Sequence, residues 1–175
     1  TLPHAIRVTR DVAELAPSST GAVTSVGVFD GVHLGHQSIL RANLERAQAL
    51  GAEPTVVTFA DHPKAVLLGR APRTLTTIEH RLALFARAGI RHVCVLTFDE
   101  ELRDTSADKF TADILEQGLN TQAFVLGFDS KFGKGRAGGP ESLEARGHAV
   151  EIAPKVMVDQ RAVSSTAIRE AVELG

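Results

Sequence analysis

The sequence contains no tryptophan, no tyrosine and a single cysteine, Cys94, among its 175 residues. One cysteine cannot form a disulfide bond within the chain, so the fold does not depend on oxidation. Cys94 lies in the apolar run 92–96 (HVCVL), which is typical of a small buried residue in a strand rather than of a reactive thiol. The chain also has little near-ultraviolet absorbance of its own, because it lacks tryptophan and tyrosine.

The sequence also lacks a long apolar segment and an excess of charge of either sign. No run approaches the ~20 apolar residues of a membrane-spanning helix, and no signal peptide is visible. The formal net charge is -2, which gives no indication of a nucleic acid or an anionic membrane as partner. We therefore expect one cytoplasmic domain over residues 1–175, with neither nucleic acid nor membrane as partner.

Strand-like and helix-like patterns alternate along the chain. Apolar, β-branched runs predict strands at residues 22–29, 54–59, 91–98, 122–126 and 148–152. Helical spacing of apolar residues predicts helices at residues 37–50, 77–88, 106–117, 140–146 and 164–174. Such alternation implies parallel pairing with right-handed crossovers. We predict a doubly wound, Rossmann-like α/β sheet of about five parallel strands, which binds ligands beyond the carboxyl ends of its strands.

The loop after the first predicted strand combines glycines with histidines, in the sequence GVFDGVHLGHQ over residues 27–37. A helix N-terminus offers unpaired N–H groups and a positive dipole end, which suit a phosphate. Gly31 and Gly35 remove side chains where a triphosphate must approach closely. His33 and His36 are three positions apart, so both can face one way on a helical turn and stabilise charge that grows on a phosphate.

Other metal and phosphate motifs account for this pattern less well. Zinc would need a third and a fourth ligand beside the histidine pair, and only Asp30 and His62 offer themselves, so we expect no metal site built from protein side chains. The dinucleotide motif G-x-G-x-x-G is absent from this turn. Residues 127–135 (GFDSKFGKG) have five residues between the glycines, and no serine or threonine follows Lys134, which excludes a Walker-type loop.

A second motif, RAVSSTAIR, occupies residues 161–169. Ser164 can cap the last predicted helix, and capping alone is the simpler interpretation. The hydroxyl groups of Ser165 and Thr166 and the guanidinium of Arg169 exceed what a cap requires. At a second helix start they could meet further phosphates, which Arg169 would bridge through two parallel hydrogen bonds.

Together, the two motifs resemble the nucleotidyltransferase superfamily that carries HxGH and SSTxxR. The stretch VGVFDGVHLGHQSIL, followed by TFADHPKAVL and GFDSKFGKGRAG, is similar to the FMN adenylyltransferase domain of bacterial FAD synthetases. This resemblance runs from about residue 23 to the end of the sequence.

The resemblance implies that FMN phosphate, already an anion, attacks the α-phosphorus of ATP without a general base and gives FAD and pyrophosphate. Mg²⁺ would bridge phosphate oxygens as the cofactor. By matched position, the catalytic residues would be His33, His36 and Arg169. The residues expected at ATP are Gly27, Phe29, Asp30, Gly31, Gly35, Arg161, Ser164, Ser165 and Thr166. Those expected at the acceptor are His62, Asp129 and Phe132.

Departures from the family pattern keep other functions open. Residues 58–63 read TFADHP where the family has TF(D/E/N)PHP, and Ser130 stands where it has phenylalanine. The chain also lacks the PTAN motif of riboflavin kinase, so we expect no kinase domain in residues 1–175 and a riboflavin kinase that is fused to the chain or works with it. The alternatives are an HxGH transferase with another phosphorylated acceptor or with CTP as donor, and an inactive nucleotide- or flavin-binding module.

Overall fold

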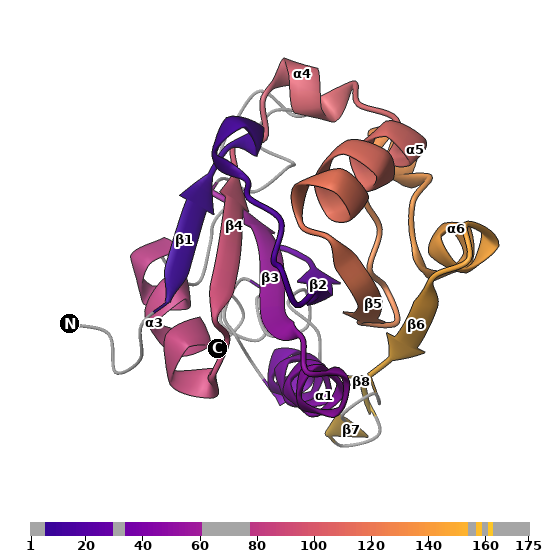
Figure 1. The fold of residues 1–175 in the computed structure, drawn as a ribbon. Coiled ribbons are helices and arrows are strands. Elements are labelled where there is room, and N and C mark those ends of the chain that lie inside the picture. The colour runs from indigo at the N-terminus through magenta and orange to yellow at the C-terminus, as the bar shows by residue number, and fades with distance from the viewer. Residues whose placement is uncertain (1–5, 30–33, 61–77, 154–156, 159–160, 163–175) are drawn as a thin grey trace.

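The computed structural model describes residues 6–29, 34–60, 78–153, 157–158 and 161–162. Six strands form one sheet in the order β1-β4-β3-β2-β5-β6, and every pairing in it is parallel (Figure 1). Their bounds are Arg7–Arg10 (β1), Ala22–Val26 (β2), Glu53–Phe59 (β3), His92–Leu96 (β4), Thr121–Leu126 (β5) and Ala149–Ile152 (β6). A separate antiparallel pair consists of Met157–Val158 (β7) and Arg161–Ala162 (β8).

Helices cover both faces of the sheet, α1 and α3 on one side and α5 and α6 on the other (Figure 1). The described helices are Leu34–Leu50 (α1), Ile78–Ala88 (α3), Glu100–Arg103 (α4), Ala107–Phe110 (α5) and Pro140–Ala145 (α6). The helix α5 continues as a π-helical segment, Thr111–Gly118 (η2), and 3₁₀ turns occur at Val12–Glu14 (η1) and Lys134–Arg136 (η3). Within the described residues no helix is both long and apolar enough to cross a membrane.

Alternate residues of the central strands pack against opposite helix layers. Val93 and Val95 of β4 join the cluster that contains Phe85 of α3, whereas Cys94 and Leu96 join the cluster that contains Phe110. This period of two is expected for a strand that is covered on both faces. Cys94 is fully buried, as predicted, and burial raises the pKa of its thiol to about 12, so it is no nucleophile at neutral pH.

A buried asparagine attaches α1 to the middle of the sheet. The side-chain amide of Asn43 donates to the carbonyl oxygens of Val23 (3.1 Å) and Thr55 (3.2 Å) and to the hydroxyl of Ser25 (2.9 Å). Asn43 is fully buried, where an amide without partners would destabilise the fold. The bonds to β2 and β3 therefore set how α1, and with it His36, lies on the sheet.

The sequence predicted the architecture but not every element. The doubly wound parallel sheet is confirmed, with six strands in place of the expected five or so. The additional strand is β1, which pairs with β4 at the edge of the sheet. The helix predicted over residues 37–50 begins earlier, at Leu34, and the one predicted over residues 106–117 divides into α5 and η2. The helix predicted over residues 164–174 lies outside the described residues.

At the amino end of β4, His92 is almost completely buried, with 1% of its surface exposed. Its Nδ1 lies 3.2 Å from Nη2 of Arg7 and its Nε2 lies 2.9 Å from the Thr9 hydroxyl. Because a guanidinium only donates, Nδ1 is the acceptor and the imidazole is neutral. Burial, and after it the charge of Arg7, lowers the pKa of His92 to about 4.

This histidine should make the fold acid-sensitive. Between pH 6.5 and 4.5 the unfolded chain protonates the imidazole and the folded chain does not, so stability must fall as the pH falls. We expect a loss of about 2 to 3 kcal/mol across that window. Urea unfolding at a series of pH values measures it.

The matched control is His92→Gln, whose pH profile should be flatter by the same amount. The salt-bridged carboxylate Glu116 does not interfere, since Arg146, with a further contribution from His148, lowers its pKa to about 2 and its effect begins only below the ordinary value of 4.5. Parallel pH profiles for the natural chain and His92→Gln would contradict the assignment.

Candidate active site

The order of the strands creates a switch point between β2 and β5. From β2 the chain proceeds through α1 to β3 and then β4, whereas β5 and β6 lie on the other side of β2. Gly27 and Gly127 follow these two strands directly. A Cβ at Gly27 would lie 3.2 Å from the Phe29 ring, and one at Gly127 would lie 3.0 Å from Ile39. Both glycines thus allow close packing where ligands bind in sheets of this type.

Beyond β2 the chain turns sharply at Phe29, which has a φ of 58°. A bulky residue seldom adopts this left-handed conformation, and such strain is concentrated at functional sites. The carbonyl oxygen of Val28, just before the turn, accepts hydrogen bonds from the Thr58 hydroxyl at 2.8 Å and from Nη1 of Arg81 at 2.6 Å. The turn is therefore held from β3 and from α3.

The ring of Phe29 connects this turn to the HxGH histidine that the structure describes. Phe29 is buried, with 3% of its surface exposed, so its ring packs inside the protein. It meets Phe85 of α3 edge to face, with centroids 5.4 Å apart, and the ring of His36 at 5.1 Å. His36 lies in the first turn of α1 and is half-buried, with Nδ1 shielded from solvent.

The loop after β5 folds back on the site through its serine. The hydroxyl of Ser130 donates to the carbonyl oxygen of Val26, at the end of β2, at 2.9 Å. Asp129, its neighbour, is exposed directly beyond β5. The basic side chains of this loop are exposed as well; they are Lys131, Lys134 and Arg136.

Phe132, which the sequence suggested for the acceptor, lies in the core. It is 4% exposed, and its ring centroid is 5.3 Å from that of Phe110. Its backbone pairs with Gly138 in both directions, at 3.1 and 2.8 Å. A side chain at Gly138 would collide with the Phe132 ring. The ring therefore braces the loop from within.

Many of the predicted site residues lie outside the described residues. This holds for the other half of the HxGH pair, for most of the second motif and for the loop after β3, that is for Asp30, Gly31, His33, His62, Ser164, Ser165, Thr166 and Arg169. For Gly35 in α1 and Arg161 in β8 the structure describes the backbone element alone. Of the predicted residues, it brings Gly27, Phe29 and His36 together at one end of α1.

Sequence reasoning missed Arg81, which contacts the site from α3. Its position could have been found, because it follows Ile78 by three residues and precedes Phe85 by four, so it belongs to the apolar side of the helix. Arg81 is 3% exposed. A charge on that side of a helix is a signal, since buried charges require specific partners.

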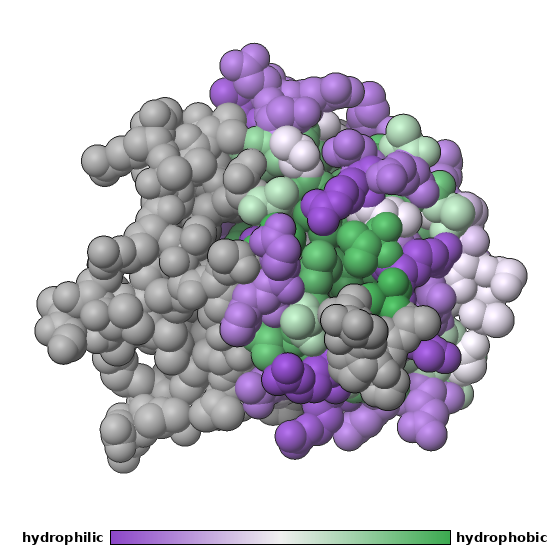
Figure 2. Space-filling view, turned by 90° about the vertical axis from the view of Figure 1, so that its left-hand side faces the viewer, coloured by the Kyte–Doolittle hydropathy of each residue, from purple (hydrophilic) through white to green (hydrophobic). Residues whose placement is uncertain are grey.

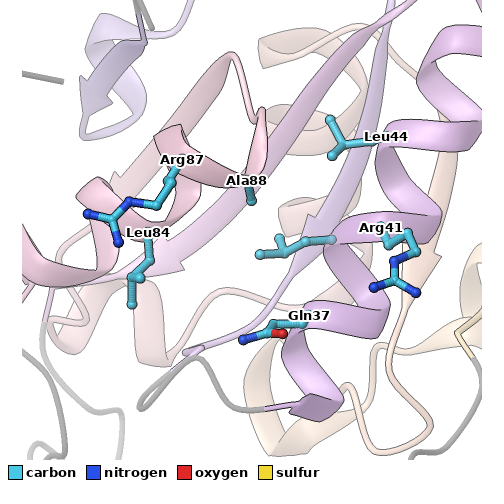
Figure 3. A pocket seen from close by; sticks show the side chains of 7 residues that line it. Gln37, Arg41, Leu44, Leu84, Arg87 and Ala88 are labelled. Carbon is cyan, nitrogen blue, oxygen red and sulfur yellow. The ribbon is translucent and has the colours of Figure 1, made fainter. Parts of the chain in front are cut away.

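A groove of about 340 Å³ runs between α1 and α3 (Figure 3). Its lining consists of Gln37, Leu40, Arg41, Leu44, Leu84, Arg87 and Ala88. Figure 2 views the molecule from the side of β1 and α3. On that side, hydrophobic residues are gathered and bordered by hydrophilic ones. None of the predicted site residues that the structure describes lines the groove, so we assign it no part in the chemistry.

No metal centre emerges from the described part of the chain. Within it, no group of three or more histidine, cysteine, aspartate or glutamate side chains could hold an ion. A zinc site of the kind considered for the histidine pair would also need residues beyond that part.

Solved structures support the fold. A crystal structure described as a macrolide-efflux protein from Streptococcus pneumoniae superposes with a TM-score of 0.84 and 26% identity, over 95% of this chain and 57% of that one. The pantothenate synthetase of Thermus thermophilus superposes with a TM-score of 0.58 and 19% identity, over 93% of this chain and 67% of that one. The second likeness concerns the fold alone.

Curated relatives are similar over most of this chain. Bifunctional riboflavin kinase/FMN adenylyltransferases of Pseudomonas fluorescens and Haemophilus influenzae are each 34% identical, over 95% and 87% of this chain. The chain spans about half the length of both, 55% and 51%. A Geobacillus thermodenitrificans protein, provisionally named for the same two activities, is 37% identical over 89% of this chain and 84% of its own length.

The family assignment follows from the extent of these matches. Residues 15–167 match the FAD synthetase family, a stretch that includes the HxGH residues 33–36 and the SST residues 164–166 of the second motif. Together with the identity to the curated relatives over most of the chain, this match shows that the chain belongs to the FAD synthetase family.

Proposed function

We propose that this chain transfers AMP from ATP to FMN, forming FAD and pyrophosphate. The observation that carries the proposal is the place of His36, in the first turn of α1 beyond the carboxyl end of β2 and against the ring of Phe29. A helix N-terminus at the switch point of a parallel sheet favours an anion. An imidazole there can donate to phosphate oxygens. Membership of the FAD synthetase family supports ATP and FMN as the substrates.

In the proposed reaction, a phosphate oxygen of FMN attacks the α-phosphorus of ATP. The bond from that phosphorus to the oxygen that bridges to the β-phosphate breaks, and pyrophosphate leaves with the bridging oxygen. The nucleophile is already an anion, so the protein need not remove a proton. Its task is to align the two phosphates and to stabilise the charge at the α-phosphate. We assign this stabilisation to His33 and His36, as hydrogen-bond donors.

The second motif is proposed to hold the far phosphates. A planar guanidinium can bind two oxygens at once, which suits Arg169 for the β and γ phosphates. The hydroxyl groups of Ser164, Ser165 and Thr166 would add hydrogen bonds, with Arg161 nearby in the chain. Close approach of the backbone to ATP is assigned to the glycines and their neighbours, Gly27, Phe29, Asp30, Gly31 and Gly35.

The acceptor is proposed to enter beside the loop that follows β5. Asp129 is exposed there, one residue before Ser130, which bonds to the end of β2. Asp129 and His62 would orient the acceptor. Phe132 would have an indirect role, because its packing on Phe110 supports the loop that carries Asp129.

Mg²⁺ is proposed as the cofactor. It prefers oxygen ligands and usually binds through substrate phosphates and one or two carboxylates. When bound, Mg²⁺ supplies positive charge to the phosphate oxygens.

A source of FMN completes the proposal. The names of the Pseudomonas and Haemophilus relatives combine FMN adenylyltransferase with riboflavin kinase. We infer that this chain is fused to a riboflavin kinase or works with one, in the cytoplasm where ATP is available. Nucleic acid and membrane have no part in the proposed reaction.

The reaction itself is the first test. With ATP, Mg²⁺ and FMN the chain should release pyrophosphate and form FAD, whereas riboflavin should stay unchanged because its neutral alcohol would need a base. Chromatography of the flavins, with radiolabelled AMP, measures both. A panel of other phosphorylated acceptors, and CTP as donor, distinguishes the alternatives. Label that never enters a flavin would overturn the assignment to FMN.

The histidines should act on turnover more than on binding. Changing His33 or His36 to alanine should lower kcat by roughly 10²–10³, the usual effect of losing one such donor. The affinity for ATP should fall much less. His80→Ala, exposed on α3, is the control and should leave kcat unchanged. A variant with weak binding and normal turnover at saturation would contradict the role.

Arg169 should distinguish ATP from AMP. Lysine cannot reproduce its planar fork, so Arg169→Lys should weaken ATP binding roughly tenfold or more and leave AMP binding nearly unchanged. Calorimetric titration of both nucleotides measures this. Arg103→Lys is the control, on a partly exposed arginine that pairs with Asp104. An equal loss for both nucleotides would indicate an arginine with a structural role.

A further inference from the structure

Arg81 is the only arginine, lysine or carboxylate that is buried among the described residues. It extends from the first turn of α3 toward the carboxyl ends of two central strands. A guanidinium is costly to remove from water unless hydrogen bonds satisfy it. A hydrophobic side chain would fill this place in an ordinary amphipathic helix. The contacts of the charge therefore indicate why it is there.

Its hydrogen bonds join the end of β2 to the end of β3. Nη1 donates to the carbonyl oxygen of Val28 at 2.6 Å and to the hydroxyl of Thr58 at 3.3 Å. Nη2 reaches the carbonyl oxygen of Ala60 at 3.5 Å. The Thr58 hydroxyl itself donates to Val28, which closes a small network. One planar group thus spans the two strand ends from which the turn before α1 and the loop after β3 depart.

Phe85 lies one helical turn after Arg81 in α3. It contacts Phe29, the residue that follows Val28 in the chain. Its ring meets the ring of Phe29 edge to face, and the Phe29 ring also contacts the ring of His36. Positions 81 and 85 lie on one side of a helix. The helix α3 therefore fixes the turn twice, at the main chain of Val28 and at the side chain of Phe29.

We propose that Arg81 is a positioning residue of the active site, which acts through Val28 and Phe29 on the orientation of the His36 imidazole. The inference rests on the proposed function of His36. The link is mechanical, because Arg81 fixes the peptide before Phe29 and the Phe29 ring supports the imidazole. Small displacements of a catalytic group reduce turnover strongly, so a group that never touches the substrate can govern the rate.

The key variant is Arg81→Met, which keeps an apolar stem of similar length and removes the donors. Arg87→Met is the matched control, on the same helix, exposed and outside the network. In Arg81→Met we expect kcat to fall roughly 10- to 100-fold at saturating ATP and FMN, with the KM for ATP changed by less than about threefold. Arg87→Met should match the natural chain. Arg81→Lys should recover only part of the loss, because one ammonium cannot span both strand ends.

A second readout reports the position of His36 without any reaction. The Phe29 ring lies edge-on to the imidazole, so its ring current shifts the imidazole proton resonances. A His36→Gln spectrum assigns these resonances. In Arg81→Met they should move toward the values of an exposed histidine, and in Arg87→Met they should stay in place. Circular dichroism melting checks that each variant is folded.

The outcomes separate the inference from the proposed function. A folded Arg81→Met variant with unmoved His36 resonances overturns the inference, whatever its kcat. Should Arg81→Met fail to fold, Phe85→Leu tests the other half of the link, since it keeps apolar volume and removes the ring that supports Phe29; unmoved resonances there overturn the inference too. Should the natural chain make no FAD, the proposed function fails, and the resonances still decide whether Arg81 positions His36.

Discussion

The parallel pairing of the sheet is the constraint from which the rest of the structure follows. All five pairings among its six strands are parallel, so every connection must return across a face and all the carboxyl ends share one edge. At that edge the chain departs in opposite directions from β2 and β5. The glycines that follow these two strands thus lie at the switch point, where sheets of this type bind ligands.

Asn43 and Arg81 attach the two helices of one face to different parts of the sheet. Asn43 bonds α1 to the middle of β2 and β3, and Arg81 bonds α3 to their ends. Apolar packing is non-directional, whereas hydrogen bonds from buried groups tolerate little displacement of the two partners. The register of both helices relative to the turn at Phe29 is therefore set by polar contacts inside an apolar core.

The sequence was sufficient for the elements whose patterns are local. Strands β2 to β5 are apolar runs, and helices α1 and α3 carry apolar residues at helical spacing. Strand β1 was missed because Arg7–Arg10 has four residues, of which only Val8 is apolar. Its pairing with β4 depends on contacts more than eighty residues apart, such as Thr9 with His92. The division of the helix near Phe110 likewise has no local signature that we can name.

For the candidate site, the motifs predicted a turn and a histidine whose described residues the structure brings together, but not which of the motif side chains pack in the core. Phe132 belongs to a motif and was predicted at the acceptor; it packs on Phe110 instead. Its direction depends on the backbone pairing with Gly138, which is not encoded in the adjacent residues. Arg81 was overlooked for the opposite reason, because an arginine in an amphipathic helix is usually solvated.

The strain at Phe29 shows why such supports are needed. A left-handed bulky residue costs about 1–3 kcal/mol, so the turn would relax if nothing opposed it. Hydrogen bonds from charged donors stabilise by about 1.5–3 kcal/mol each, and the Val28 carbonyl accepts one from Arg81 besides that of Thr58. The aromatic contact with Phe85 adds about 0.5–1.5 kcal/mol. These contributions are of the same size as the strain. The turn can therefore persist before any substrate arrives, and binding energy need not be used to create it.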